Sequence, residues 1–333
     1  MLAVTDWSES LTERVVAALD AGDSERARGL VLGGDGRAKN LASEFRLMHK
    51  GLGITMRVAL HVMEEQHPFD AVTTCRLLSE FHAIYLALAE RYLSPPKSTL
   101  PVREFDPAEI NRYDVVELLE WVETEFVRDQ ASRAAAIADS IDAGEDVVGA
   151  LMQKRDEGFR PLHDALIEGL ASIFSSVVDG AGTDVEGAES LRRFQLAVAE
   201  GQREGIDKWE EGGSRKLAAA FTHLLVQHLS DFDVEEQSDR FLISQRLCGS
   251  GGVLIRKGRY EGANALRTIA GRSEVTGGHD SLPAYCTHCP MWNTVAPSAW
   301  YGHEHVRFIH PARPDGACTL AVMKYDEHDR GEN

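Results

Sequence analysis

Hydrophobic side chains recur every three or four positions through most of the first 230 residues, which is the period of an amphipathic helix. The pattern is clearest over residues 40–66 and 69–93, and His67 with Pro68 separates these two stretches. Further helices are predicted near residues 107–126, 128–142, 145–177 and 186–229. The larger part of the chain is therefore predicted to be helical.

Two helix starts are indicated by capping residues. Ser10 and Glu13 have the spacing of a capping box, in which each side chain accepts a hydrogen bond from the other residue's backbone N–H. Asp106 followed by Pro107 is typical of an N-cap with proline at the first helical position. Residues 97–105, between two predicted helices, are expected to form a linker.

After Phe232 the pattern changes to short apolar segments bounded by turn residues, which favours strands. The candidate strands are residues 240–247, 253–256, 306–309 and 319–323. The last two flank Pro314-Asp315-Gly316 and are predicted to pair as a β-hairpin. The predicted fold class is α+β: a mostly helical region, residues 1–230, followed by a small antiparallel sheet with a Cys/His cluster, residues 231–333.

The net charge of −18 belongs almost wholly to the helical region. From Arg246 to the end, ten Lys/Arg stand against nine Asp/Glu, so the first 245 residues carry about −19. An acidic surface without a basic stripe disfavours nucleic acid and anionic membranes as partners. No stretch approaches the ~18 apolar residues of a spanning helix, and the N-terminus lacks the pattern of a secretory signal. We expect a cytoplasmic protein whose five cysteines are free thiols.

Cysteines and histidines gather near the end of the chain, where Cys286 and Cys289 form a C-x2-C pair. The possible metal ligands there are Cys248, Cys286, His288, Cys289, His303, His305, His310 and Cys318. Zinc prefers four thiolate or imidazole ligands in a tetrahedral arrangement. A hairpin would bring His310 and Cys318 together. The predicted ligands of zinc, or alternatively iron, are Cys286, Cys289, His310 and Cys318, with Cys248 or His288 as replacements for one of them.

Three other interpretations of the C-x2-C pair stay open. Cysteine is among the residues most often buried, so Cys286 and Cys289 could simply be core thiols. A redox pair is usually set in a βαβ pattern, which is not predicted here. A thiolate nucleophile would need a histidine nearby to lower its pKa. A bound metal is favoured over these because thiols and imidazoles are concentrated in one region.

The string Cys248-Gly-Ser-Gly-Gly252 is the other unusual segment. Three glycines in four residues let the backbone turn sharply or approach a ligand closely. With the cations that follow, Gly251, Arg256 and Lys257 are candidates for holding a carboxylate or phosphate. The alternative is a tight turn with solvated charges. The segment is not a P-loop, because no Gly-Lys-Ser/Thr follows and no helix is predicted after it.

The residues from Tyr285 to Cys289, together with residues 306–322, resemble the tail of 4-vinyl-reductase-type small-molecule-binding domains. In that tail a strand carries a cysteine, a Gly-Asp turn follows, and a second cysteine opens the last strand. Here His310 stands at the first of these positions, Cys318 at the second, and Asp-Gly replaces Gly-Asp. The layout is also similar to that of L-2-amino-thiazoline-4-carboxylate hydrolases. The resemblance implies small-molecule binding and a structural zinc.

The number of histidines exceeds what one four-coordinate site needs, which favours a metal-dependent enzyme acting on a small, anionic metabolite. Three protein ligands and an open position for water would make the metal catalytic. The candidates for proton transfer are His288, His303, Glu304 and His305. A hydrolase is the default reaction, since one resembling family is a hydrolase. The alternative is a non-catalytic small-molecule-binding or sensory domain with a closed structural zinc.

Overall fold

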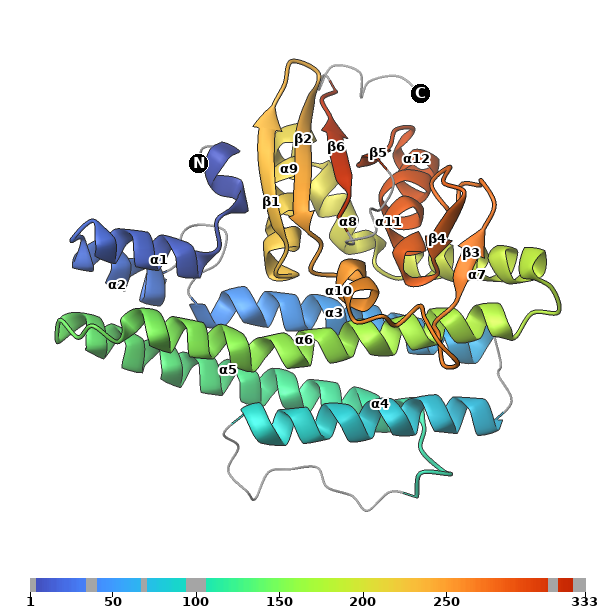
Figure 1. Cartoon of the computed structure of the whole chain (residues 1–333), viewed down its shortest axis with the longest axis horizontal. Helices are drawn as coiled ribbons and strands as arrows, with labels where there is room; N and C mark the ends of the chain where they lie inside the picture. The colour runs from blue at the N-terminus through green and yellow to red at the C-terminus, as the bar shows by residue number, and fades with distance from the viewer. Residues whose placement is uncertain (1–3, 34–40, 67–70, 94–105, 311–316, 326–333) are drawn as a thin grey trace. The chain divides into compact units, whose positions relative to one another are not determined.

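The computed structural model describes residues 4–33, 41–66, 71–93, 106–310 and 317–325, and the chain forms two compact units (Figure 1). The first, here called the helical unit, comprises Glu9–Arg57 and Asp70–Leu166 together with Met1. The second, here called the sheet unit, comprises Leu2–Ser8, Val58–Phe69 and Ile167–Asn333. The predicted α+β class is confirmed, with a mostly helical N-terminal part followed by a small antiparallel sheet and cysteines.

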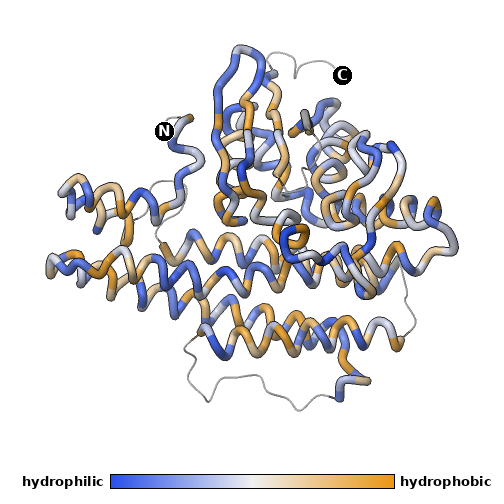
Figure 2. Tube along the Cα trace, viewed as in Figure 1, coloured by the Kyte–Doolittle hydropathy of each residue, from blue (hydrophilic) through white to orange (hydrophobic). Residues whose placement is uncertain are grey.

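The helical unit is built from long amphipathic helices. They are α1 (Leu11–Asp20), α2 (Ser24–Gly33), α4 (Ala71–Tyr92), α5 (Arg112–Asp142), and the parts of α3 (Leu41–Gln66) and α6 (Val148–Asp179) that belong to this unit. The predicted capping box is confirmed: Glu13 N donates to Ser10 Oγ at 3.1 Å, and Ser10 N donates to Glu13 Oε2 at 2.7 Å. Along these helices hydrophobic and hydrophilic positions alternate with the helical period, as Figure 2 shows.

The predicted start of a helix at Asp106 and Pro107 is wrong. Asp106 instead closes a short turn by accepting from Ala108 N at 2.9 Å, and α5 begins after Asn111. Asn111 caps the helix because its side chain accepts from Tyr113 N at 2.9 Å. The two helices predicted at 107–126 and 128–142 are one, since no helix breaker stands between them. The predicted linker, residues 97–105, lies outside the described residues.

The sheet unit contains three helices where one was predicted over residues 186–229. They are α7 (Asp184–Glu200), α8 (Arg203–Glu210) and α9 (Gly213–Gln227). Gly213 has a φ of 73°, a left-handed conformation that favours glycine and redirects the chain between α8 and α9. The break gives α8 its own direction, and α8 supplies a carboxylate to the site described below.

The main sheet has four antiparallel strands in the order β1-β2-β6-β5. They are β1 (Asp231–Glu236), β2 (Arg240–Leu247), β5 (Arg307–His310) and β6 (Thr319–Met323). The predicted pairing of the last two strands is confirmed, while the turn at 314–316 lies outside the described residues. Phe241 and Ile243 lie two residues apart on the buried face of β2. They pack with Leu217 and Phe221 of α9 in the core of this unit.

The predicted strand at residues 253–256 is wrong, because this segment belongs to α10 (Gly251–Arg256). A short apolar run has the same composition in a strand and in a buried helical turn, so periodicity alone does not separate them. Beyond α10 come β3 (Thr268–Ala270), β4 (Ser281–Pro283), η2 (Tyr285–Thr287), α11 (His288–Pro290), the π-helical turn η3 (Met291–Val295) and α12 (Ala296–Tyr301). The C-x2-C pair therefore lies on consecutive helical turns that precede β5.

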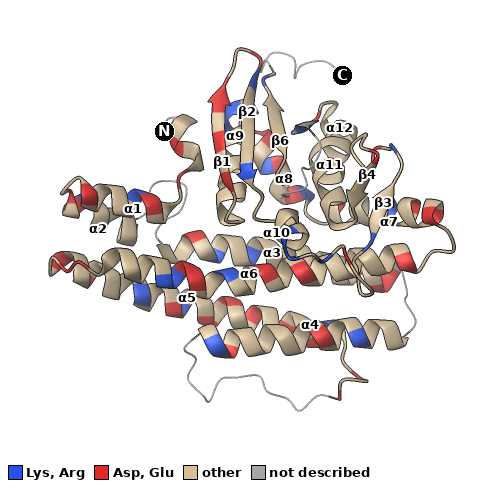
Figure 3. Ribbon diagram, viewed as in Figure 1, with Lys and Arg blue, Asp and Glu red and all other residues tan. Residues whose placement is uncertain are grey.

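Acidic side chains are prominent on β1, which is an edge strand (Figure 3). Arg246 on β2 forms ion pairs with Asp231, at 2.5 Å, and with Asp233. Charges on an edge strand discourage pairing with another chain. No helix in the described part of the chain is both long enough and apolar enough to cross a membrane.

Candidate functional site

A sharp turn in the sheet unit sets the positions of two predicted site histidines. Gly302 ends α12 with a φ of 80°, a left-handed conformation that suits glycine. The backbone N–H groups of His305 and Val306 then both donate to the carbonyl of Asn293 at 2.9 Å. The loop between α12 and β5 is thereby tied to the π-helical turn η3, and His303 and His305 project from it.

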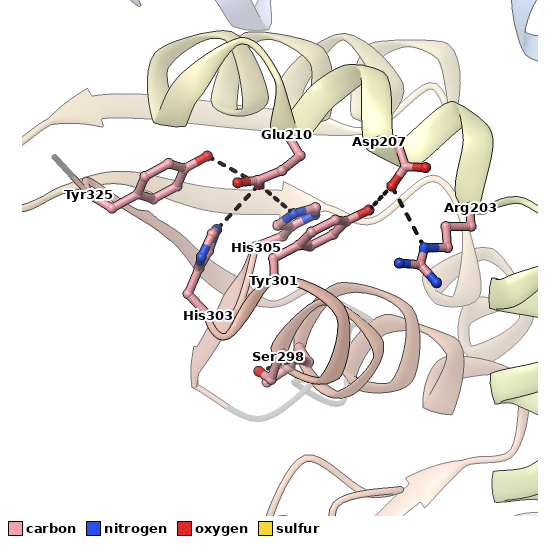
Figure 4. Close-up of polar contacts among 9 residues, drawn as sticks. Arg203, Asp207, Glu210, Ser298, Tyr301, His303, His305 and Tyr325 are labelled. Carbon is pink, nitrogen blue, oxygen red and sulfur yellow. Dashed lines mark hydrogen bonds and ion pairs between the residues drawn. The ribbon is translucent and has the colours of Figure 1, made fainter. Parts of the chain in front are cut away.

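Both imidazoles converge on one carboxylate of α8 (Figure 4). Nε2 of His303 lies 3.2 Å from Glu210 Oε2, and Nε2 of His305 lies 3.0 Å from the same oxygen. Tyr325, just after β6, donates its hydroxyl to that oxygen at 3.3 Å. Because a carboxylate only accepts, each Nε2 carries the hydrogen in this arrangement. We call Glu210, His303 and His305 the histidine–glutamate cluster.

The cluster is largely shielded from solvent. The side chain of His305 is 3% exposed, that of Glu210 13% and that of His303 30%. Burial lowers the pKa of His305 below its usual value, and the charge of Glu210 opposes that shift only in part. The imidazole of His305 is therefore neutral at pH 7, which is the form that binds a metal ion.

A second carboxylate of α8 lies one turn before Glu210 and faces the same loop (Figure 4). Asp207 accepts a hydrogen bond from the hydroxyl of Tyr301 at 2.5 Å, and the ring of Tyr301 stacks on that of His305 with centroids 5.2 Å apart. Burial, and then the contact with Asp207, raise the pKa of Tyr301. Arg203 lies 3.8 Å from Asp207. Tyr301 is thus a neutral donor held against His305.

The donor set fits a divalent metal ion. The ligand atoms of the three residues all lie within 4.8 Å of one another. With bonds of about 2.0–2.1 Å, neighbouring ligand atoms of a tetrahedral zinc site lie about 3.3–3.4 Å apart. The two Glu210–histidine distances are close to that edge length. Two imidazoles and one carboxylate are the ligands of catalytic zinc sites with an open fourth position, and also of non-haem iron sites.

Two other residues predicted to act with this loop have different surroundings. Glu304 pairs with Arg307, so its carboxylate serves an ion pair at the start of β5. His288 lies in the C-x2-C turn, where Nδ1 donates to the carbonyl of Tyr285 at 2.6 Å and Nε2 lies 3.4 Å from Cys289 Sγ. Burial lowers the pKa of His288 to about 4. Their predicted roles in proton transfer stay predictions.

The cysteines predicted to bind metal come from three parts of the sheet unit. Cys286 and Cys289 lie in η2 and α11, and Cys318 immediately precedes β6. Cys248, the predicted replacement ligand, directly follows β2. The backbone of His310 pairs with Thr319 in the sheet, but its side chain lies outside the described residues.

The residues predicted to bind an anion lie on α10 or directly after it, rather than on a loop after a strand. Gly251 is its first residue, and a Cβ built there would lie 2.5 Å from Cys286 Sγ, so the glycine allows the helix to touch the C-x2-C turn. Arg256 donates to the carbonyl of Cys248 at 2.9 Å. Lys257 is the residue directly after α10. Their role in binding an anion stays a prediction.

No family model, no curated protein and no solved structure matches this chain. The resemblance of its C-terminal part to 4-vinyl-reductase-type domains therefore stays an expectation.

The acidic and phenolic members of the site, Glu210, Tyr301 and Tyr325, were not predicted from the sequence. Glu210 lies 93 residues before His303, in a charged run that predicts only a solvated helix face. Tyr301 is the last residue of α12, directly after Trp300, and Tyr325 lies two residues after β6, so neither stands in a pattern that indicates a site. The one available signal was the pair His303 and His305, whose spacing indicated a site without indicating its third ligand.

Proposed function

We propose that this chain is a metal-dependent enzyme of hydrolase type, acting on a small anionic metabolite, with zinc or alternatively iron held by the histidine–glutamate cluster. The observation that carries the proposal is the convergence of His303 and His305 on Glu210 at 3.2 and 3.0 Å. A metal ion bound there would supply a water of pKa about 7 and polarise a substrate oxygen. Three protein ligands leave the position that such chemistry needs.

The residues around the cluster support a reaction rather than binding alone. Tyr301 donates its single hydroxyl hydrogen to Asp207, and this contact holds its ring stacked on His305, so Tyr301 positions that imidazole. Arg203, paired with Asp207, brings a guanidinium to the same face of α8, where it can attract an anionic substrate. Because its pKa is raised, the hydroxyl of Tyr301 stays protonated at pH 7 and keeps its hydrogen bond to Asp207.

A closed structural site is the second candidate, and one observation favours it. The hydroxyl of Tyr325 lies 3.3 Å from Glu210 Oε2, so a fourth possible ligand atom of the chain is close to the cluster. If Tyr325 completed the coordination, the ion would tie α8 to the loop before β5 and leave no position for water. This is the non-catalytic binding domain predicted as the alternative.

The test is elemental analysis of full-length protein, comparing wild type with Glu210→Gln, His305→Ala and the control Glu211→Gln. Glu211 is the exposed residue directly after α8, so the control removes the same charge one position further along the chain. We expect one equivalent of metal to be lost in the first two variants and kept in the control. Metal content unchanged in both cluster variants would contradict the proposal.

Activity separates the catalytic from the structural candidate. Wild type is assayed against a panel of small carboxylate- and phosphate-bearing esters and amides, with Tyr301→Phe and Tyr325→Phe alongside. The enzyme proposal expects hydrolysis that falls in Tyr301→Phe and survives in Tyr325→Phe. Loss of metal in Tyr325→Phe, with no hydrolysis by wild type, would favour the closed structural site.

A further inference from the structure

Four of the five cysteines belong to the sheet unit, and their thiols differ in ligand type from the histidine–glutamate cluster. They are Cys248, Cys286, Cys289 and Cys318, and each keeps part of its surface accessible. The fifth, Cys75, belongs to α4 of the helical unit. The set therefore differs from a scatter of unrelated core thiols and calls for a physical reason.

The sheet places two of the four at one end. β2 and β6 are antiparallel with Ser244 opposite Thr319, and Gln245 N donates to the carbonyl of Cys318 at 3.2 Å. Cys318 enters the sheet at the end where Cys248 leaves it. Strand register thus brings Cys318 opposite Gln245, which lies three residues before Cys248 in the sequence.

The Cys-Gly-Ser-Gly-Gly turn directs backbone N–H groups at the sulfur of Cys248. Burial raises the pKa of this thiol, and hydrogen bonds from the backbone N–H groups of Gly252 and Ser250 oppose that shift. Hydrogen bonds from backbone N–H groups stabilise a thiolate and orient a metal ligand. The same turn carries Gly251 against Cys286 Sγ, where a Cβ would approach to 2.5 Å. Glycine is required there because the turn and the C-x2-C segment are in contact.

The four thiols are also close enough to act on one another electrically. The charges of Cys248 and Cys318 raise the pKa of Cys286, and those of Cys286, Cys248 and Cys318 raise the pKa of Cys289, in each case added to a larger effect of burial. These electrostatic contributions indicate that Cys248 and Cys318 lie near the C-x2-C pair.

We propose that Cys248, Cys286, Cys289 and Cys318 bind one soft divalent metal ion of the zinc class, as a site separate from the histidine–glutamate cluster. Four thiolates and no open position make it a structural site. It joins the end of the β2–β6 pair to the C-x2-C turn. Cys248 takes the fourth place that the sequence analysis gave to His310.

The thiols must move to bind the ion. Among the described residues, no three of these sulfur atoms lie within 4.8 Å of one another. In a tetrahedral site with zinc–sulfur bonds of about 2.3 Å, neighbouring sulfurs lie about 3.8 Å apart. Cys289 is at present oriented by His288, whose Nε2 lies 3.4 Å from its sulfur. Binding one ion would therefore require side-chain rotation of the cysteines, with loss of that contact.

The first test needs no variant of the site. Reduced, full-length protein is freed of metal, reloaded with Co²⁺ alone, and examined for the thiolate-to-cobalt charge transfer and tetrahedral d–d bands of a tetrathiolate site. In parallel, a thiol reagent is applied to zinc-loaded protein before and after chelation. We expect one fast-reacting thiol of five before chelation, lost in Cys75→Ser, and all five afterwards.

The second test identifies the ligands. Cys248→Ser and Cys318→Ser should each lose or change the cobalt spectrum, whereas Cys75→Ser, the matched control, should leave it as in wild type. Glu210→Gln should leave the thiolate-to-cobalt charge-transfer band unchanged, because that band reports only the cysteine site, so failure of this site and failure of the proposed function are distinguishable. The spectrum of His310→Ala should equal that of wild type.

Four outcomes would overturn the inference. They are a wild-type cobalt spectrum without thiolate bands, an unchanged spectrum in Cys248→Ser, disulfides in freshly isolated protein, and the visible absorption of an iron–sulfur cluster. The first and last outcomes are measured on wild type, so they test the proposal even if the variants fail to fold.

Discussion

One of the buried histidines of the helical unit, His49, should make that unit sensitive to mild acid. His49 on α3 is 1% exposed and hydrogen-bonds through Nε2 to the hydroxyl of Tyr85 on α4, while its Nδ1 is buried without a hydrogen-bond partner among the described residues. An imidazolium needs two acceptors, and here only one contact exists. Burial, with a smaller contribution from the charge of Arg57, lowers the pKa of His49 to about 3.

The sign and size of the effect follow from proton linkage. In the unfolded chain His49 takes up a proton near pH 6.5, whereas in the folded chain it stays neutral down to about pH 3. The unfolded state therefore binds more protons below pH 6.5, and stability falls as pH falls. Each pH unit in that window removes about 1.4 kcal/mol, so acidification from pH 6.5 to 5.0 removes about 2 kcal/mol through His49 alone.

The measurement compares wild type with the double variant His49→Leu/Tyr85→Phe. The double variant removes both polar partners, because His49→Leu alone would leave the buried hydroxyl of Tyr85 unpaired at about 1–3 kcal/mol. Urea unfolding is followed at pH 6.5 and 5.0 by hydrogen exchange of peptides from α3 and α4, which isolates the helical unit. Other titrating groups act equally in both proteins. We expect wild type to lose about 2 kcal/mol more than the double variant. Equal losses would refute the reasoning.

Three further predictions concern local packing. Ser10→Ala should lower the free energy of unfolding by about 1 kcal/mol, measured with urea, because it removes the capping box of α1. Gly251→Ala should make the thiol of Cys286 react with a thiol reagent while zinc is bound, because the added methyl forces the turn away; Gly205→Ala, with nothing within 4 Å, should not. Asn293→Ala should weaken metal binding at the histidine–glutamate cluster by about 10-fold, measured by competition with a chelator, because it removes the side-chain amide that ties η3 to Cys289 and so loosens the segment whose backbone carbonyl holds His305.

The elements that the sequence predicted well are those with a strong period. The stretch 40–66 became α3, and residues 319–323 became β6, because a long amphipathic stripe or a strand beside a turn leaves few alternatives. Residues 253–256 were assigned to a strand, since a four-residue apolar run carries no period. The α8 helix was hidden inside one long prediction, because glycines were not taken as breaks. Tertiary contacts decide such short segments.

Only the rarer residue types of the candidate site, its histidines, could be predicted from the sequence. His303 and His305 could be selected because histidine is scarce, whereas Glu210 is one of 53 acidic residues and has no distinguishing neighbour. Its role depends on the direction of α8, which differs from that of α9 because the chain turns between them at Gly213. No spacing rule encodes that turn. Chemistry carried by common residue types at long sequence separation is therefore visible only after folding.

One short segment links the two proposed metal sites. The side-chain amide of Asn293 donates to the carbonyl of Cys289 at 2.9 Å, and the carbonyl of Asn293 accepts from the backbone N–H of His305 at 2.9 Å. The thiolate turn thus fixes η3, and η3 fixes the loop that presents the histidines. Glu210 instead reaches the loop from α8. If both proposed sites bind metal, an ion held by the four cysteines would stabilise the segment on which His305 is placed, so its removal should also weaken metal binding at the histidine–glutamate cluster.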